Sequence, residues 1–136
     1  MNVLIDTSIW SLAFRRSTPQ DDPNVLELRR LIDELRVTII GPIRQEILSG
    51  IKEPSRFDAL RQRLRAYPDL IIDVEDYERA AEFYNVCRQN GVQGSNTDYL
   101  ICAVAAVRDL TIFTTDLDFQ RYRDYIPIAL HQAREA

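Results

Sequence analysis

The sequence predicts a three-layer α/β fold, in which helices cover both faces of a mostly parallel sheet. Apolar residues switch repeatedly along the chain between the spacing of a strand and that of a helix, which is typical of alternating strands and helices. The strand segments are short and apolar, as expected for strands that are buried on both faces. A length of 136 residues with a hydrophobic share of 46% predicts one domain, spanning residues 1–136.

The first elements are expected within residues 3–35. Val3–Ile5 predicts a buried strand, and a helix is expected from Ser8 to about Phe14. Asp22 and Pro23 then predict the N-cap and the first residue of a second helix. The apolar face of that helix consists of Val25, Leu28, Leu31, Ile32 and Leu35.

The middle of the chain predicts one strand and two helices. β-Branched residues within 37–40 indicate the second strand, and the Gly-Pro pair that follows turns the chain into a helix over residues 43–48, which Gly50 ends. The next amphipathic helix is marked by Phe57, Leu60 and Leu64. Residues 70–74 fit either a strand or an extended connector.

The last third predicts two helices, a strand, a short helical turn and a last strand. A long helix ends near Gly91, and its apolar side carries Tyr77, Ala80, Ala81, Tyr84 and Cys87. The segment "NTDYLICAVAAV", residues 96–107, predicts a helix with no polar stripe wide enough to face water, so it belongs inside the protein. "LTIFTT" predicts a strand, "DLDFQRY" a helical turn, and residues 128–130 the final strand.

The charge balance argues against a protein that holds nucleic acid by general electrostatic attraction alone. The formal net charge is −4, from 17 basic and 21 acidic residues. Lys52 is the only lysine, and arginine makes the better bidentate contacts to phosphate. Local clusters are formed by Arg15, Arg16, Arg61, Arg63 and Arg65. These clusters fit either solvated helix faces or contacts to a nucleic acid.

The sequence shows no targeting segment. The start "MNVLIDTSIW" has no basic segment and Asp6 interrupts its apolar stretch, so neither a signal peptide nor a membrane span is predicted, and the cytoplasm is the expected location. Cys87 and Cys102 lie inside helical patterns without metal-ligand spacing. This pattern predicts buried thiols rather than a disulfide or a zinc site.

Four acidic residues are expected at one edge of the sheet, because parallel strands bring the turns that follow them to a common edge. Asp6 directly follows the first strand, and Asp116 follows the strand "TIF" by two residues. Glu46 lies about one turn into the helix after the second strand. Asp98 lies in the first turn of the apolar helix, whose start can meet the same edge.

Each acid also has a simpler interpretation. Asp6 could cap the helix that follows it, Asp98 could gain from a helix dipole, Asp116 could form a turn with the preceding threonines, and Glu46 could be solvated. These interpretations predict no shared location. The rule for the ends of parallel strands, in contrast, brings all four acids together.

Converging carboxylates would need a cation. Two carboxylates about 5 Å apart repel each other by about 3 kcal/mol at an effective dielectric near 20. Oxygen ligands without histidine or cysteine favour Mg²⁺ or Mn²⁺, and the only histidine, His131, is not expected to be a ligand or a base. Such a site is typical of phosphoryl chemistry, in which a metal-activated water attacks a phosphate.

The four acids lie in "VLIDTSIW", "PIRQEIL", "TDYLICAVA" and "TTDLDF". In this order and spacing, the segments resemble the acidic motifs of PIN-domain ribonucleases of the VapC type, the toxins of type II toxin–antitoxin pairs. The resemblance spans essentially the whole chain, and it implies a PIN-like α/β/α fold. "SNTD" and the loop over residues 15–22 are less typical, so they leave the choice of substrate open.

The resemblance implies a role for each matching residue. The catalytic, metal-binding set is Asp6, Glu46, Asp98 and Asp116, of which Asp6 and Asp98 are the firmest metal ligands. Supporting roles fall to Thr114, Ser8 and Asp118. Thr114 is expected to position water or a carboxylate, Ser8 has a similar place after Asp6 or caps the helix, and Asp118 is expected to be auxiliary or structural.

The resemblance further implies a homodimer, an RNA substrate and a VapB-type antitoxin whose C-terminal segment blocks the active-site groove. In-line attack by a metal-bound hydroxide would leave a 5′-phosphate and a 3′-hydroxyl. Two other classes of protein remain open. One is a phospho-acceptor receiver domain, which needs a lysine near the end of its last strands, where Lys52 does not lie. The other is a catalytically silent module that binds RNA or an antitoxin, with acids that only cap helices.

Overall fold

The fold is built on a four-stranded, fully parallel sheet, which a computed structural model describes within residues 1–135. The strands are β1 (Val3–Ile5), β2 (Val37–Thr38), β3 (Thr111–Phe113) and β4 (Ala129–Leu130), in the order β2-β1-β3-β4. The helices are α1 (Thr7–Phe14), α2 (Pro23–Asp33), α3 (Gly41–Leu48), α4 (Pro54–Leu64), α5 (Val74–Gln89), α6 (Asn96–Arg108) and α7 (Asp118–Arg123). The predicted α/β class with a parallel sheet is therefore confirmed.

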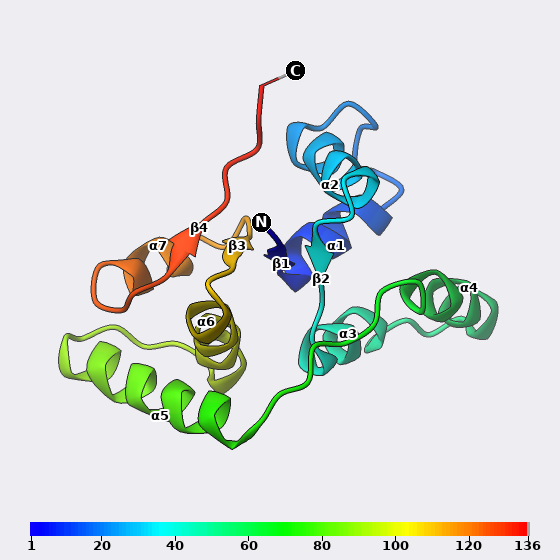
Figure 1. Ribbon diagram of the computed structural model, residues 1–136. Coiled ribbons are helices and arrows are strands. Elements are labelled where there is room, and N and C mark those ends of the chain that lie inside the picture. Colours follow the sequence, from blue (N-terminus) through cyan, green and yellow to red (C-terminus); the bar gives the residue numbers. More distant parts are fainter. Residues whose placement is uncertain (136) are drawn as a thin grey trace.

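Helices cover both faces of the sheet, with α1 and α2 on one side and α5, α6 and α7 on the other (Figure 1). This division follows from the strand order, because β2 lies on one side of β1 while β3 and β4 lie on the other. Connections between parallel strands are right-handed, so a reversal of direction across the sheet sends the connecting helices to the opposite face.

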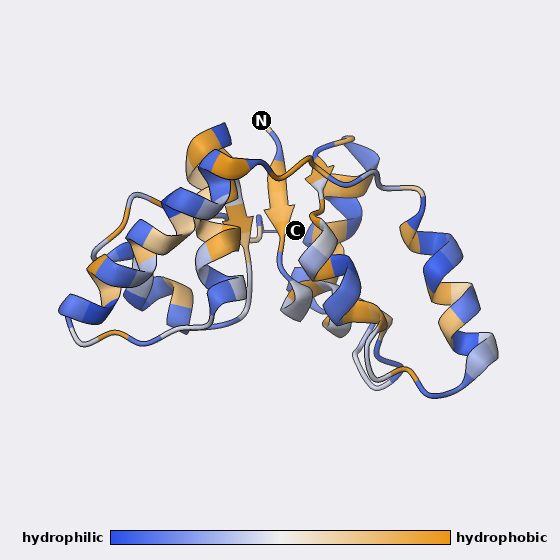
Figure 2. Ribbon diagram, turned by 90° about the horizontal axis from the view of Figure 1, so that it is seen from below, coloured by the Kyte–Doolittle hydropathy of each residue, from blue (hydrophilic) through white to orange (hydrophobic). Residues whose placement is uncertain are grey.

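The centre of the core is α6, as its sequence predicts. Every residue from Tyr99 to Ala105 is buried, and the helix packs against β3 and α5. Figure 2 shows the apolar residues gathered on the strands and on the inner sides of the helices. None of the helices described in residues 1–135 is long and apolar enough to cross a membrane.

Three predicted helix ends lie at the residues that the sequence indicates. The Asp22 carboxylate accepts hydrogen bonds from the backbone N–H groups of Asn24 (2.9 Å) and Val25 (3.2 Å), and so caps α2. Gly50 and Gly91 adopt positive φ angles of 87° and 76° just beyond α3 and α5, a conformation in which a Cβ atom is strained. The predicted N-cap and both predicted stops are therefore confirmed.

Several boundaries differ from those the sequence predicts. The first helix begins at Thr7 rather than Ser8, the second strand ends at Thr38 rather than residue 40, and Leu35 lies exposed beyond the end of α2. The helix after β2 begins at Gly41 rather than residue 43, because Pro42 fits the first helical turn, where its missing N–H costs no hydrogen bond. Residues 70–73 form no strand and lie in the connection between α4 and α5, and Val74 already begins α5. A bridge between Ile39 and Asp69 is the nearest pairing. The cysteines are free and buried, as predicted.

Candidate metal centre

The candidate site lies where β1 and β3 end side by side. Ile5 is paired with Phe113, and the Asp6 backbone N–H donates to the Phe113 carbonyl at 2.9 Å, so Asp6 and Thr114 are neighbours just beyond the two strands. The strand order reverses at this point, because the chain leaves β1 toward β2 and returns on the other side as β3. Ligands of open parallel sheets bind at such a point.

The Asp6 carboxylate is held by two hydroxyl groups. Its Oδ2 atom accepts hydrogen bonds from Thr114 Oγ1 at 2.7 Å and from Ser8 Oγ at 2.8 Å. Asp6 occupies the N-cap position of α1, yet its side chain makes no capping hydrogen bond, so the capping interpretation is wrong. Both hydroxyl groups donate to the same oxygen, Oδ2, of this buried carboxylate.

The two hydroxyl groups are themselves fixed by backbone donors. Thr114 Oγ1 accepts from the Asp116 N–H at 3.0 Å, and Ser8 Oγ accepts from the Thr115 N–H at 3.1 Å. The two hydroxyl oxygens lie 3.2 Å apart, and each hydroxyl donates its single hydrogen to Asp6. Thr114 and Ser8 therefore brace Asp6 against the turn that carries Asp116.

Three carboxylates form a compact cluster: Asp98 from α6, Asp116 from the turn after β3, and Asp118 from the first turn of α7. One ligand oxygen from each lies within 4.8 Å of the others. Asp116 also serves its own turn, because its Oδ1 accepts from the Asp118 N–H at 2.9 Å. The structure thus brings Asp118 into this carboxylate cluster, whereas Asp6 and Glu46 lie outside it.

Asp98 is the third residue of α6, and its side chain accepts a hydrogen bond from another helix. Ser95 is the N-cap and accepts from the Asp98 N–H at 3.0 Å, while Asp98 Oδ2 accepts from the Tyr122 hydroxyl at 2.7 Å. Burial raises the pKa of Asp98, the Tyr122 hydrogen bond opposes that rise, and the carboxylates of Asp116 and Asp6 raise it further. Asp98 therefore experiences the negative charge of both neighbouring acids.

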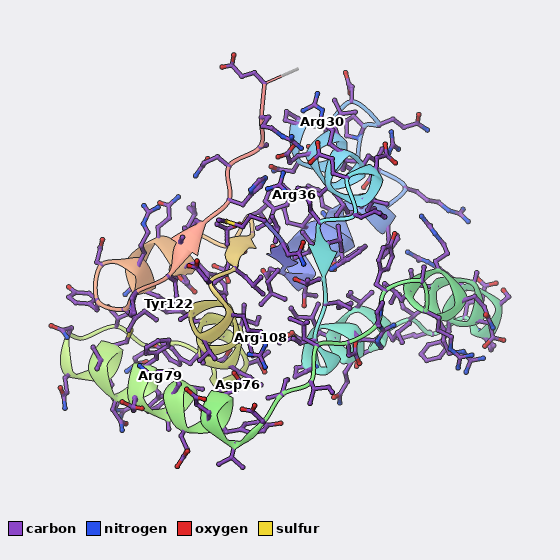
Figure 3. The ribbon with its side chains drawn as sticks, viewed as in Figure 1. Arg30, Arg36, Asp76, Arg79, Arg108 and Tyr122 are labelled. Carbon is purple, nitrogen blue, oxygen red and sulfur yellow. The ribbon has the colours of Figure 1, made fainter. Side chains whose placement is uncertain are left out.

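Tyr122 is a site residue that the sequence analysis missed. It lies on α7 (Figure 3), where it is fully buried and its hydroxyl donates to Asp98. The available signal is its spacing, because Tyr122 follows Asp118 by four residues and so shares a helix face with it.

Glu46 lies at the rim of the site. It is exposed on α3, and its Oε1 atom accepts a hydrogen bond from the Thr7 hydroxyl at 3.1 Å. Thr7 directly follows Asp6 in the chain. The sole histidine is elsewhere, as expected, since His131 Nε2 lies 2.5 Å from Glu27 Oε2.

The donor set fits a hard divalent cation. Among residues 1–135, Asp118 is the one acid of the carboxylate cluster with a basic group within 4 Å, and that pair, with Arg121, spans 3.7 Å between exposed side chains. Exposed ion pairs contribute little, so the repulsion within the cluster is largely uncompensated. Carboxylate oxygens at such spacing suit Mg²⁺ or Mn²⁺, which keep open positions for water and phosphate.

Comparison with known proteins relates the chain to one family. The family model described as "PIN domain" matches residues 3–125. The chain is 34% identical over 121 residues to VapC ribonuclease Mb1587 of Mycobacterium bovis, covering 86% of this chain and 88% of that protein. Ribonuclease VapC11 of Mycobacterium tuberculosis matches to the same extent.

Solved structures share the fold. The chain in the FitAcB structure from Neisseria gonorrhoeae aligns with a TM-score of 0.78 at 21% identity, covering 96% of this chain and 97% of the other. The structure of VapBC2 from Rickettsia felis bound to a promoter DNA fragment aligns with a TM-score of 0.76 at 18% identity, covering 96% and 98%.

Proposed function

Because this chain belongs to the PIN-domain family of VapC ribonucleases, we propose that it is the toxin of a toxin–antitoxin pair and hydrolyses RNA phosphodiester bonds at the carboxylate cluster. The observation that carries the proposal is the convergence of Asp98, Asp116 and Asp118 within 4.8 Å, next to the braced carboxylate of Asp6. Acids that merely cap helices would have no reason to meet at one point.

In this proposal the cluster of Asp98, Asp116 and Asp118 holds Mg²⁺ or Mn²⁺, and Asp6 Oδ1 completes or orients the site. When bound, the ion would polarise the scissile phosphate and lower the pKa of a water molecule. Thr114 and Ser8 keep Asp6 in place, and Glu46 marks the rim where RNA enters. Hydrolysis without participation of the 2′-hydroxyl leaves a 5′-phosphate and a 3′-hydroxyl.

The chain has no lysine at the position that a phospho-acceptor receiver domain requires. Lys52 lies in the connection between α3 and α4, whereas a receiver needs a lysine after its last strands, beside the acids.

Incubation of the antitoxin-free protein with total cellular RNA tests the proposal directly. We expect cleavage with Mn²⁺ or Mg²⁺, 5′-phosphate ends at discrete positions when the ends are mapped, and no cleavage in excess EDTA. RNA cutting that persists in EDTA would contradict a metal-dependent mechanism, and intact RNA in every metal would contradict the nuclease.

We propose that a VapB-type antitoxin docks in the hollow of about 260 Å³ beside α1, α2 and α4. Its walls are largely aromatic and aliphatic, and Arg29 and Arg63 add positive charge. The Trp10 indole N–H, which is buried here, has no hydrogen-bond partner within residues 1–135. These features fit an amphipathic segment with an acidic residue.

Binding of the purified cognate antitoxin tests this surface. Arg63→Glu reverses a charge at the hollow and is expected to weaken binding, whereas Arg79→Glu on the distant α5 is expected to leave it unchanged. Equal binding by both variants would place the antitoxin elsewhere.

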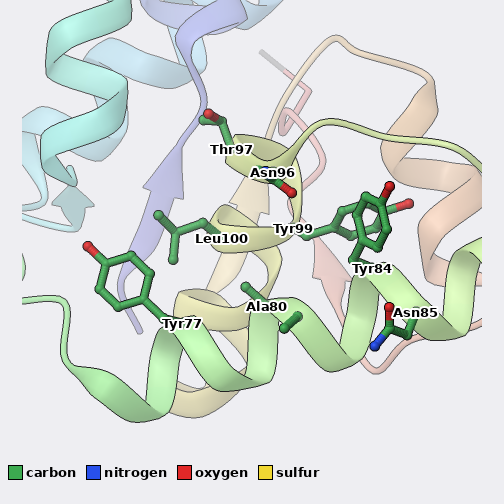
Figure 4. A pocket seen from close by; sticks show the side chains of 9 residues that line it. Tyr77, Ala80, Tyr84, Asn85, Asn96, Thr97, Tyr99 and Leu100 are labelled. Atoms are coloured by element: carbon green, nitrogen blue, oxygen red, sulfur yellow. The ribbon is translucent and has the colours of Figure 1, made fainter.

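We propose that a second copy of the chain covers the hollow of about 370 Å³ between α5 and α6. Tyr77 and Ala80 from α5 and Leu100 from α6 line it, and Tyr77 lies at one end of the group (Figure 4). Ile71 and Val74 lie nearby in the chain, and both are largely exposed. Sedimentation analysis should show a dimer that Tyr77→Arg disrupts and that the exposed-site control Glu78→Arg leaves intact.

A further inference from the structure

We propose that Tyr122 is a positioning residue that holds the Asp98 carboxylate toward Asp116 and Asp118. This inference rests on the proposed metal site and adds to it a residue that neither the acidic motifs nor the family match assigns. The hydrogen bond from Tyr122 Oη to Asp98 Oδ2 measures 2.7 Å.

The reason that Asp98 needs such a partner appears in a comparison of two helix starts within this molecule. In α5, Asp73 caps the helix and the third-position acid, Asp76, turns back to accept from the Asp73 backbone N–H at 3.0 Å, which completes a capping box. The start of α6 has the same arrangement of an N-cap, Ser95, and a third-position acid, Asp98.

Only half of that motif forms in α6. Ser95 Oγ accepts from the Asp98 N–H, but the Asp98 carboxylate accepts from Tyr122 instead of turning back to the Ser95 backbone. The Tyr122 hydroxyl thus donates to the third-position acid of α6, whereas in α5 the N-cap backbone N–H donates to the third-position acid. Without the hydroxyl, the capping geometry seen in α5 becomes available to Asp98.

The phenol itself is rigidly placed. Tyr122 is fully buried, with its ring centroid 5.0 Å from that of Tyr99 and 5.3 Å from that of Phe119. Gly94 provides the room, because a Cβ atom at this position would overlap the Tyr122 hydroxyl oxygen and the adjacent ring carbons. A larger residue at Gly94 would therefore displace the donor from Asp98.

Tyr122 also connects two of the clustered acids. Asp118 and Tyr122 are four residues apart on α7 and lie on one face of that short helix. The hydrogen bond to Asp98 therefore fixes α6 relative to the helix that carries Asp118. Its loss should loosen the spacing of the cluster and weaken the binding of a cation.

Binding of Mn²⁺ alone, measured by calorimetry on the metal-free protein, tests this role apart from activity. Tyr122→Phe keeps the buried ring and removes the hydroxyl, and we expect its dissociation constant for Mn²⁺ to rise roughly 10-fold to 100-fold. The Mn²⁺ concentration for half-maximal RNA cleavage should rise in parallel, with a smaller change in rate at saturating Mn²⁺. Tyr125→Phe, at a half-exposed tyrosine nearby, is the matched control.

Gly94→Ala provides the second variant, because it displaces the hydroxyl while keeping the tyrosine. Its Mn²⁺ affinity should fall like that of Tyr122→Phe, and combining the two changes should weaken binding by less than the product of the single effects. Folded variants that bind Mn²⁺ as tightly as the wild type would overturn the proposal. If the wild type binds Mn²⁺ but cuts no RNA, the proposed function fails while the positioning role stands.

Discussion

Asp76 on α5 and Arg108 on α6 form a bidentate ion pair, with Nη1 to Oδ1 at 2.6 Å and Nη2 to Oδ2 at 2.9 Å (Figure 3). The Asp76 side chain is fully buried, and Arg108 also donates to the Ile71 carbonyl at 2.7 Å. The pair joins the start of α5 to the end of α6, opposite the end of α6 that carries Asp98.

Asp76→Ala should therefore destabilise the protein strongly. The change leaves Arg108 without its partner and removes half of the α5 capping box, and losing one partner of a buried pair typically costs about 3–5 kcal/mol. Urea denaturation at neutral pH measures the loss of unfolding free energy. Glu78→Ala, an exposed acid on the same helix, should change it by about 0.5 kcal/mol or less.

The stability contributed by Asp76 should depend on pH. Arg108 lowers the pKa of Asp76 below the ordinary value of 3.8, against the opposing effect of burial. A carboxyl whose pKa is lower in the folded state stabilises the protein above the unfolded-state value and loses that effect as the pH falls through the folded-state value. The difference between wild type and Asp76→Ala in denaturation experiments should hence be full at neutral pH and shrink below pH 3.8.

Asp98→Asn should abolish RNA cleavage without unfolding the protein. The amide keeps the size of the side chain and can still accept from Tyr122, but it removes a negative charge from the carboxylate cluster. We expect a loss of activity on the order of 100-fold or more in a cleavage assay. Asp33→Asn, the same change on the exposed end of α2, should cut RNA normally.

Thr114 and Thr115 are neighbours in the chain, and they allow a matched test of the hydroxyl that holds Asp6. Thr114→Val removes the hydroxyl that donates to Asp6 and accepts from the Asp116 N–H, so activity should fall roughly 10-fold to 100-fold. Thr115 is exposed and contributes its backbone N–H to the site, so Thr115→Val should remain active. Equal activity of the two variants would show that the Thr114 hydroxyl is dispensable.

Mn²⁺ should stabilise the folded protein through the carboxylate cluster. At a free concentration about 100 times its dissociation constant, a ligand of the folded state alone contributes about 2.7 kcal/mol. Thermal unfolding should therefore shift to higher temperature with Mn²⁺, and Asp118→Asn should reduce that shift. If Mn²⁺ leaves the melting temperature unchanged, the result would favour a catalytically silent module that binds RNA or an antitoxin.

The sequence predicted those parts of the site that depend on local pattern and strand order. Asp6 follows a short apolar strand, and Asp116 follows another, so the rule for strand ends placed both acids near one edge. The apolar character of residues 99–105 placed α6 in the core and Asp98 at its margin. These inferences need no knowledge of how side chains pack.

The remaining details depend on packing between helices. Asp118 was expected to be auxiliary, but the direction of α7 brings its first turn into the carboxylate cluster. Tyr122 has the sequence appearance of an ordinary core aromatic, and its contact with Asp98 exists only because α7 packs against the start of α6. Glu46 is one turn into α3, and that distance leaves it at the rim.

The hydrogen bond between Thr114 and Asp6 joins residues 108 positions apart in the chain. A polypeptide still being made cannot assemble this pocket until the segment from Thr114 to Tyr122 has left the ribosome. Translation proceeds at roughly 5–20 residues per second. The carboxylate of Asp6 therefore lacks its Thr114 partner until nearly the whole chain has been synthesised.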